Sequence, residues 1–393
     1  AGGRVDPVQI PAVPVSRATA RPHLVDITMF WSPRSGGVAR YLRSKRNWLN
    51  AHTTWRHTIM VPGPSTSETK HVSGVRLPFS GGYRFPLRRR ATARAIIEQR
   101  PDLIEVGDPY RCAWSALDAG QQLGVPVAAF YHSNVQALAQ RWLPRASHAP
   151  VRQYLRHLYR RFDAIFAPSG WAADALLQLG LDNVVLQPHG VDCEMFHPRW
   201  RDLSWRDELG YASSDIVLLY AGRFAPEKNL DRLAAAVDRL GHPYRLVAMG
   251  DGPSPPRGAR LTLVPYQTNP AALARVLASA DMFVHAGDQE TFGLGALEAL
   301  ACGTPVVARA CAGLADLVDG RAVIGVEHDD VAALADAISS VAPVAATLRT
   351  EARLRSLQFD ANRTFAQLLQ RYTTLCLSMR PIDAETAERY AAL

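Results

Sequence analysis

Short apolar segments alternate with segments of helical periodicity along most of the chain. The first apolar segment, 23–30, is followed by a glycine-containing turn and then by apolar residues at Val38, Leu42 and Leu49. This order predicts a strand, a loop and an amphipathic helix, because strand patterns repeat every two residues and helix patterns every 3.6 or so. Further strands are expected at 57–63, 102–107, 125–132, 162–169, 183–192, 215–222, 244–250, 260–266, 281–287 and 304–311.

Strands that alternate with helices of about 10 to 15 residues are typical of parallel sheets with right-handed crossovers. The polar segment 193–210 separates two such series. We therefore expect an α/β protein of two Rossmann-like, doubly wound domains that face each other across a cleft, with this segment as the hinge. Ligands of such folds bind at the carboxyl ends of the strands.

The charge of the chain is divided unevenly between its halves. The net charge is +8, but residues 1–199 hold 25 Lys and Arg against 13 Asp and Glu, a net +12, whereas residues 200–393 hold 19 against 23, a net −4. A basic half favours an anionic partner, such as a lipid surface, an acidic acceptor or nucleic acid. A general preference for arginine is an alternative explanation, since 41 of the 44 basic residues are Arg.

The sequence also bears on the compartment. No run of about 18 consecutive apolar residues occurs, and residues 1–22 lack the apolar core of a secretory signal, so we interpret them as a loose lead-in. The five cysteines are scattered without a Cys-x-x-Cys pair, which is typical of free thiols in a reducing compartment. We expect a cytoplasmic protein, either soluble or peripheral on the inner face of the membrane.

The most informative stretch is Glu290-Thr-Phe-Gly-Leu-Gly-Ala-Leu-Glu298, directly after an expected strand. The backbone N–H groups around Phe292, Gly293 and Leu294 would open a helix, and a helix N-terminus suits a diphosphate. Glu298 then lies about one turn inside the helix, where its carboxylate can accept both hydrogen bonds of a ribose diol. Glu290 precedes the turn and is placed to accept hydrogen bonds from sugar hydroxyls.

A second loop, Ala221-Gly-Arg-Phe-Ala-Pro-Glu-Lys-Asn229, also follows an apolar strand and carries two cations, Arg223 and Lys228. The planar fork of arginine and the compact charge of lysine together suit a leaving diphosphate. Lys228 is the only lysine after residue 199. In a chain that otherwise uses arginine, this indicates a role that arginine fills badly.

These stretches resemble the E-x7-E motif and phosphate-binding loop of the retaining, nucleotide-sugar-dependent GT-B glycosyltransferases of group 1, the family 4-like enzymes. The resemblance covers about residues 28–325, and it extends to the Gly36–Gly37 turn, the strand-end His132 and the turn at 250–252. It implies that the catalytic residues are His132, Arg223, Lys228 and Glu290. The donor-binding residues that it implies are Gly36, Gly37, Arg223, Lys228, Gly250, Asp251, Gly252, Phe292, Gly293, Leu294 and Glu298.

The resemblance also implies a role for each of the two domains. Residues 23–195 are expected to form the acceptor domain and residues 196–355 the nucleotide-sugar domain. The tail, 356–393, has one apolar helical face that needs a partner, and packing on the N-terminal domain is one arrangement.

The resemblance implies transfer of a hexose, of mannose or glucose type, from a nucleotide diphosphate sugar such as GDP-mannose or UDP-glucose. The acceptor would be lipid-linked, a glycan or a small molecule, and the anomeric configuration would be retained. No Asp-x-Asp follows a strand, so we predict no metal and no cofactor besides the co-substrate: Arg223, Lys228 and the helix N-terminus supply the positive charge.

Three alternatives stay open at this point. A glycoside hydrolase would use Glu290 and Glu298 as its carboxylate pair, but it leaves Arg223 and Lys228 unexplained. A sugar-nucleotide epimerase shares the two-domain layout. A non-enzymatic nucleic-acid or anionic-surface binder would use the arginine runs at 84–94 and 141–161, which match no nucleic-acid module. The second run interleaves arginine with aromatic residues and leucine, as in a membrane-surface helix or a solvated helix face.

Overall fold

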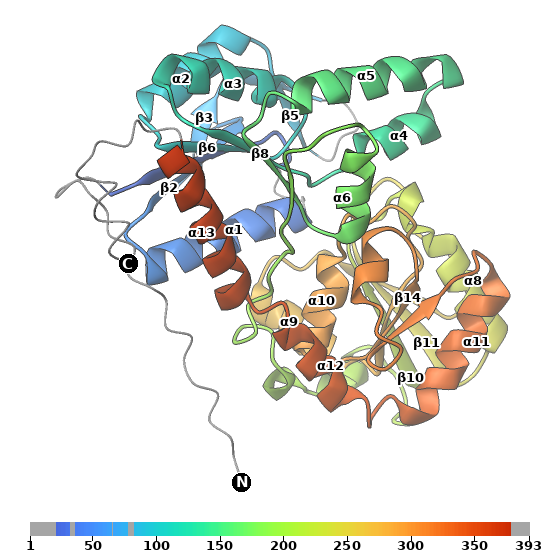
Figure 1. Ribbon diagram of the computed structural model, residues 1–393. Helices are drawn as coiled ribbons and strands as arrows, with labels where there is room; N and C mark the ends of the chain where they lie inside the picture. Colours follow the sequence, from blue (N-terminus) through green and yellow to red (C-terminus); the bar gives the residue numbers. More distant parts are fainter. Residues whose placement is uncertain (1–20, 32–35, 65, 78–81, 379–393) are drawn as a thin grey trace.

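Two α/β domains, each built on a parallel sheet, make up the described part of the chain (Figure 1). The computed structural model describes residues 21–31, 36–64, 66–77 and 82–378, so most of the lead-in 1–22 and the end of the tail lie outside the described residues. The predicted fold class of two Rossmann-like domains is confirmed.

The N-terminal sheet has the strand order β3-β2-β1-β6-β7-β8-β9, and every neighbouring pair is parallel. Most of its strands are short apolar runs, because helices cover both faces of a parallel sheet. The strands are β1 (His23–Ile27), β2 (Arg56–Pro62), β3 (Lys70–Val72), β6 (Leu103–Val106), β7 (Val127–Phe130), β8 (Ala164–Ala167) and β9 (Val184–Leu186). The helices are α1 (Gly37–His52), α2 (Arg89–Glu98), α3 (Arg111–Leu123), α4 (Val135–Trp142), η1 (Arg145–Ser147), α5 (His148–Tyr159) and α6 (Gly170–Leu177).

An antiparallel hairpin, β4 (Gly74–Arg76) with β5 (Arg84–Pro86), is added to this domain. The sequence did not predict it, because strands of three residues are too short for an alternating pattern to show.

The C-terminal sheet is also parallel, in the order β12-β11-β10-β13-β14-β15. Its strands are β10 (Ile216–Ala221), β11 (Tyr244–Gly250), β12 (Leu261–Pro265), β13 (Met282–His285), β14 (Val306–Arg309) and β15 (Val323–Val326). Its helical segments are η3 (Pro226–Lys228), α8 (Leu230–Leu240), α9 (Pro270–Ser279), α10 (Leu294–Ala301), η4 (Ala312–Leu317), α11 (Val331–Val341), η5 (Ala342–Val344) and α12 (Arg349–Leu357).

The segment 193–210, expected as a hinge, is docked on the C-terminal domain. It forms η2 (Pro198–Trp200) and α7 (Ser204–Glu208), and it buries Trp205 in that domain's core. Arg206 holds it to the end of α9 through an ion pair with Asp281 at 2.7 Å. The two passages of the chain between the domains instead lie side by side, where Val191 pairs with Asp360 in a parallel bridge.

After the second passage, α13 (Ala361–Ser378) packs on the N-terminal domain beside α1 (Figure 1). Phe365, Leu368 and Leu369 supply its apolar face. The hydroxyl of Tyr372 donates to Glu105 Oε2 at 2.5 Å, inside a buried cluster that also holds Lys45. The last described helix therefore belongs in space to the first domain.

Both sheets have a switch point where a ligand crevice is expected. β1 lies between β2 and β6, and β10 lies between β11 and β13. Connections from the two sides of such a strand run to opposite faces of the sheet, which leaves a crevice at its carboxyl end. The loops that follow β1, β10 and β13 therefore start at these crevices, and they are the loops that carry the candidate motifs.

Candidate active site

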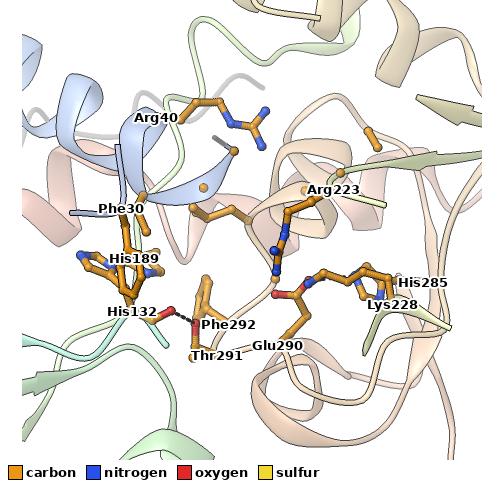
Figure 2. A pocket seen from close by; sticks show the side chains of 18 of the residues that line it. Phe30, Arg40, His132, His189, Arg223, Lys228, His285, Glu290, Thr291 and Phe292 are labelled. Carbon is orange, nitrogen blue, oxygen red and sulfur yellow. Dashed lines mark hydrogen bonds and ion pairs between the residues drawn. The ribbon is translucent and has the colours of Figure 1, made fainter. Parts of the chain in front are cut away.

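A cavity of about 320 Å³ lies between the two domains at these loops (Figure 2). Nine of the thirteen residues that the sequence put forward line it. They are Gly36, Gly37 and His132 from the N-terminal domain, and Arg223, Lys228, Glu290, Phe292, Gly293 and Leu294 from the C-terminal domain. The tertiary structure thus brings most of the candidate residues to one place.

Two helix N-termini border this cavity from opposite domains. α1 begins after Gly36 and α10 after Gly293, and neither N-cap residue offers a side chain to cap its helix. A Cβ atom on Gly37 would lie only 3.4 Å from Leu294 Cδ1 of the other domain. Uncapped N–H groups and the two helix dipoles favour an anion here. Gly293 has φ +101°, and a Cβ there would lie 2.6 Å from Leu314 Cδ2, so glycine is required.

The loop after β10 presents both cations. One turn of 3₁₀ helix, η3, is followed by Asn229 in the left-handed region with φ +51°, a conformation that asparagine tolerates. Arg223 Nη2 donates to Glu227 Oε1 at 2.5 Å, and the arginine side chain is about half exposed to the cavity and solvent. Lys228 follows on the same turn, and its side chain is largely buried.

Glu290 is held by two donors on one oxygen. Lys228 Nζ donates to Glu290 Oε1, and His285 Nε2 lies 3.0 Å from the same atom. The Gly287 N–H donates to His285 Nδ1 at 3.0 Å, so the proton on Nε2 points at Glu290. Burial by itself would raise the pKa of the Glu290 carboxyl, but Lys228 and His285 outweigh it and hold that pKa below its usual range. Glu290 is therefore ionised, and its Oε2 accepts no hydrogen bond from the described residues.

Glu298 reaches across to the N-terminal domain. Its Oε2 pairs with Arg40 Nη1 of α1 at 3.0 Å, and the glutamate is 6% exposed. Burial raises the pKa of Glu298, and Arg40 partly opposes this. Glu298 is not among the residues that line the cavity, whereas Arg40 is. A ligand that uses this carboxylate has to share it with Arg40 or displace Arg40.

His132 forms the N-terminal wall with His189 (Figure 2). The two rings are parallel, and both lie against Phe130, with centroids 4.6 and 5.0 Å from it. Burial lowers the pKa of His132 well below its usual value and that of His189 to about 3, so both imidazoles are neutral at pH 7. The His132 carbonyl accepts a hydrogen bond from the Thr291 hydroxyl of the opposite domain at 3.3 Å.

The turn Gly250-Asp251-Gly252 does not line the cavity. A Cβ on Gly250 would lie 1.9 Å from the Gly222 carbonyl oxygen, and one on Gly252 would lie 2.2 Å from the Phe224 carbonyl oxygen. Both glycines are thus required for close packing of this turn against the loop of Arg223. In this structure the turn supports the loop of Arg223 from behind.

Sequence reasoning missed several residues that line the cavity, among them Phe30, Arg40, Tyr83, His189 and His285. One signal was present: His285 is the last residue of β13, as a side chain at such a crevice should be. Arg40 and Tyr83 carried no signal, because they reach the cavity only through the arrangement of the two domains.

Two structural absences apply to the described residues alone. No group of three or more His, Cys, Asp and Glu side chains among them is arranged to hold a metal ion. No single described helix is long and apolar enough to cross a membrane. The helical segments 331–344 and 349–357 reach the necessary length and hydropathy only when taken together, and they are bent by 106° relative to each other.

The fold and this site define a nucleotide-sugar-dependent glycosyltransferase of the GT-B type, and comparisons with known proteins agree. The family described as Glycosyltransferase Family 4 matches residues 35–195, and that described as Glycosyl transferases group 1 matches residues 215–342. The chain belongs to this glycosyltransferase family. Membership sets aside the hydrolase, epimerase and nucleic-acid alternatives.

Individual relatives support the assignment. The chain is 30% identical over 387 residues to a GDP-mannose-dependent alpha-(1-6)-phosphatidylinositol dimannoside mannosyltransferase of Mycobacterium tuberculosis, which covers 92% of this chain and 99% of the relative. It is 34% identical over 231 residues to a GDP-mannose-dependent alpha-mannosyltransferase of the same species, covering 57% and 60%. Among solved structures, sucrose-phosphate synthase from Thermosynechococcus elongatus shares the fold, with a TM-score of 0.75 at 22% identity, covering 91% of this chain and 100% of that one.

Proposed function

We propose that the protein transfers mannose from GDP-mannose, with retention and without a metal ion, to a lipid-linked acceptor that carries a phosphate. The observation that carries this proposal is the convergence of two uncapped helix N-termini, Arg223 and Lys228 on one cavity. The donor and acceptor are taken from the relative that matches almost the whole chain, which acts on phosphatidylinositol dimannoside with GDP-mannose.

The arrangement suggests a pose for the donor. The diphosphate lies between the N-termini of α1 and α10, with Arg223 and Lys228 beside it. The ribose diol binds Glu298, which then releases or shares Arg40. The mannose lies between Glu290, whose Oε2 is open to accept from hydroxyls, and the wall of His132.

In this pose the bond from the anomeric carbon to the β-phosphate oxygen breaks as GDP leaves. The acceptor hydroxyl attacks from the face that GDP vacates, and its proton passes to the departing phosphate. Negative charge grows on that phosphate, so fixed cations stabilise the transition state more than the ground state. The neutral His132 is placed to hydrogen-bond the sugar without repelling its oxocarbenium charge.

A turnover assay tests this proposal. With GDP-mannose and deacylated phosphatidylinositol dimannoside, we expect GDP release, an α-mannosyl product by NMR, and an unchanged rate in excess EDTA. An inactive enzyme in EDTA that manganese restores would contradict metal independence, and a β-linked product would contradict retention. Free mannose as the sole product would indicate hydrolysis instead.

We also propose that the enzyme is cytoplasmic and attaches to the inner face of the membrane. The two arginine runs approach each other through α3, which packs against α2 and whose Trp114 donates a hydrogen bond to Tyr154 of α5 (Figure 1). Arg89 and Arg161 both lie over the Trp114 ring, 5.0 and 5.5 Å from its centroid. Two exposed apolar side chains, Leu87 and Leu143, lie within these runs. Basic and apolar groups together are typical of a surface that binds anionic lipid.

Removing charge from this face should weaken vesicle binding. Arg90, Arg94 and Arg160 are exposed and form no ion pair among the described residues. Each basic side chain near an anionic surface contributes about 1 kcal/mol, so replacing all three by glutamine should lower the partition coefficient by roughly 100-fold. Cosedimentation with phosphatidylglycerol–phosphatidylcholine vesicles measures this.

The matched control replaces three exposed arginines of the C-terminal domain, Arg239, Arg257 and Arg321, by glutamine. It removes the same charge and should bind vesicles like the unmodified protein. Equal loss in both triple variants would show that net charge, and not this face, drives binding.

A further inference from the structure

A second cavity, of about 540 Å³, lies in the N-terminal domain beside the active-site cavity. It begins where β2 ends at Pro62, at the same edge of the sheet, and the β4–β5 hairpin forms its other side. Trp31, Val61 and Pro62 make its lining partly apolar, while Arg76 and Arg84 supply its only charged side chains among the described residues. The carboxyl edge of a parallel sheet is where ligands bind in this fold class.

The two arginines are directly opposite each other in the hairpin ladder, so their side chains project from the same face. Like charges in this position destabilise a hairpin. Among the described residues neither arginine forms an ion pair, and Arg84 donates only to the Gly74 carbonyl oxygen, at 3.4 Å. Arg43, whose guanidinium lies 4.7 Å from the centroid of the Trp31 ring, by contrast pairs with Glu68 at 3.0 Å. The charge of Arg76 and Arg84 is thus left without compensation by the protein.

This cavity adjoins the active-site cavity. Phe30 lines the active-site cavity and the next residue, Trp31, lines the second; Tyr83 and Arg84 are divided in the same way. The two cavities are therefore bordered by the same two segments of the chain, 30–31 and 83–84. A molecule that reaches past these segments would place its anionic group in the second cavity and a hydroxyl group in the first.

We infer that the second cavity binds the phosphate group of the acceptor, with Arg76 and Arg84 as its ligands and the Trp31 ring beside the adjoining sugar or cyclitol. A phosphate between two opposed guanidinium groups removes their repulsion and forms charge-assisted hydrogen bonds with both. The inference rests on the proposed function for the acceptor's phosphate, whereas the anion site itself does not depend on that proposal.

Phosphate binding tests the site without knowledge of the acceptor. With saturating GDP in the donor site, isothermal titration with inorganic phosphate should detect one site in the unmodified protein. Arg76→Gln and Arg84→Gln should each weaken it by roughly tenfold, since each removes a hydrogen bond to a charged group. Arg84→Lys, which keeps the charge, should retain part of the affinity. The matched control is Arg363→Gln, which changes an exposed arginine on α13 that forms no ion pair with any other described residue, and it should change nothing.

Acceptor kinetics then distinguish a lipid headgroup from free phosphate as the ligand. Deacylated phosphatidylinositol dimannoside carries the phosphodiester, and inositol dimannoside lacks it. We expect the glutamine variants to raise KM only for the phosphorylated acceptor, with kcat and the KM of GDP-mannose unchanged. If phosphate binds but KM does not move for either acceptor, the site is one for free phosphate and the assignment to the acceptor is wrong.

Unchanged phosphate affinity in the glutamine variants, with GDP still bound, would overturn the anion site. Failure of the unmodified protein to bind GDP or to turn over GDP-mannose would overturn the proposed function instead. Because GDP affinity is measured in every variant, misfolding is recognised separately from loss of the site.

Discussion

Replacing Lys228 by alanine is expected to lower kcat by about 100- to 1000-fold, the range seen when one pre-organised charge donor is removed from a transition state. Lys228 lines the cavity, donates to Glu290 and is largely buried, so water cannot replace it fully. The loss should fall on kcat more than on the KM of GDP-mannose, because the charge on the leaving phosphate grows only as the bond breaks. Steady-state kinetics with GDP-mannose measure both constants.

The control for this variant is Arg239→Ala, which removes one positive charge from the exposed end of α8. Its kcat should stay within about twofold of the unmodified enzyme, because Arg239 is exposed and does not line the cavity, so that solvent and salt screen its charge. Lys228→Arg keeps the charge but changes its shape, and we expect intermediate activity. A kcat for Lys228→Ala close to that of the unmodified enzyme would remove this lysine from the mechanism.

Replacing Glu290 by glutamine is the second large expected effect, a fall in kcat of roughly 100-fold or more. The amide keeps the size of the side chain and can still accept from Lys228 and His285, but it loses the negative charge that faces the sugar in the proposed pose. Lys228 then faces a neutral amide in place of a carboxylate, so the affinity for GDP should stay the same or rise. Kinetics and GDP titration on one preparation measure this divergence.

Combining the two substitutions tests whether Lys228 and Glu290 act as a unit. They share a hydrogen bond, so the double variant should lose far less than the product of the two single losses. Glu298→Gln serves as the comparison on the same motif, because the Glu298 carboxylate pairs with Arg40 and not with Lys228. We expect this substitution to weaken GDP binding and to leave kcat nearly unchanged. Additive losses for Lys228 and Glu290 would show that their hydrogen bond does not couple them in catalysis.

Much of the candidate site was predictable because its residues follow strands. Arg223 and Lys228 come directly after β10, and Glu290 shortly after β13, so a parallel sheet necessarily brings these loops to one edge. The turn 250–252 also follows a strand but packs behind the Arg223 loop. The position of a residue after a strand predicts at which edge of the sheet it lies. It does not predict whether its loop faces the cavity or is covered by another loop.

The sequence by itself determined the alternation of strands and helices, the division into two domains, the loops at their carboxyl edges and the paired motifs on those loops. These depend on periodicity and turn chemistry within a few residues, which a local stretch of sequence can display. Only the tertiary structure decided that Arg40 pairs with Glu298, that His285 orients Glu290, that α13 returns to the first domain and that Arg76 opposes Arg84. The first and third of these join segments far apart in the sequence, and all four depend on how domains, hairpins and side chains pack, which no local pattern of residues specifies.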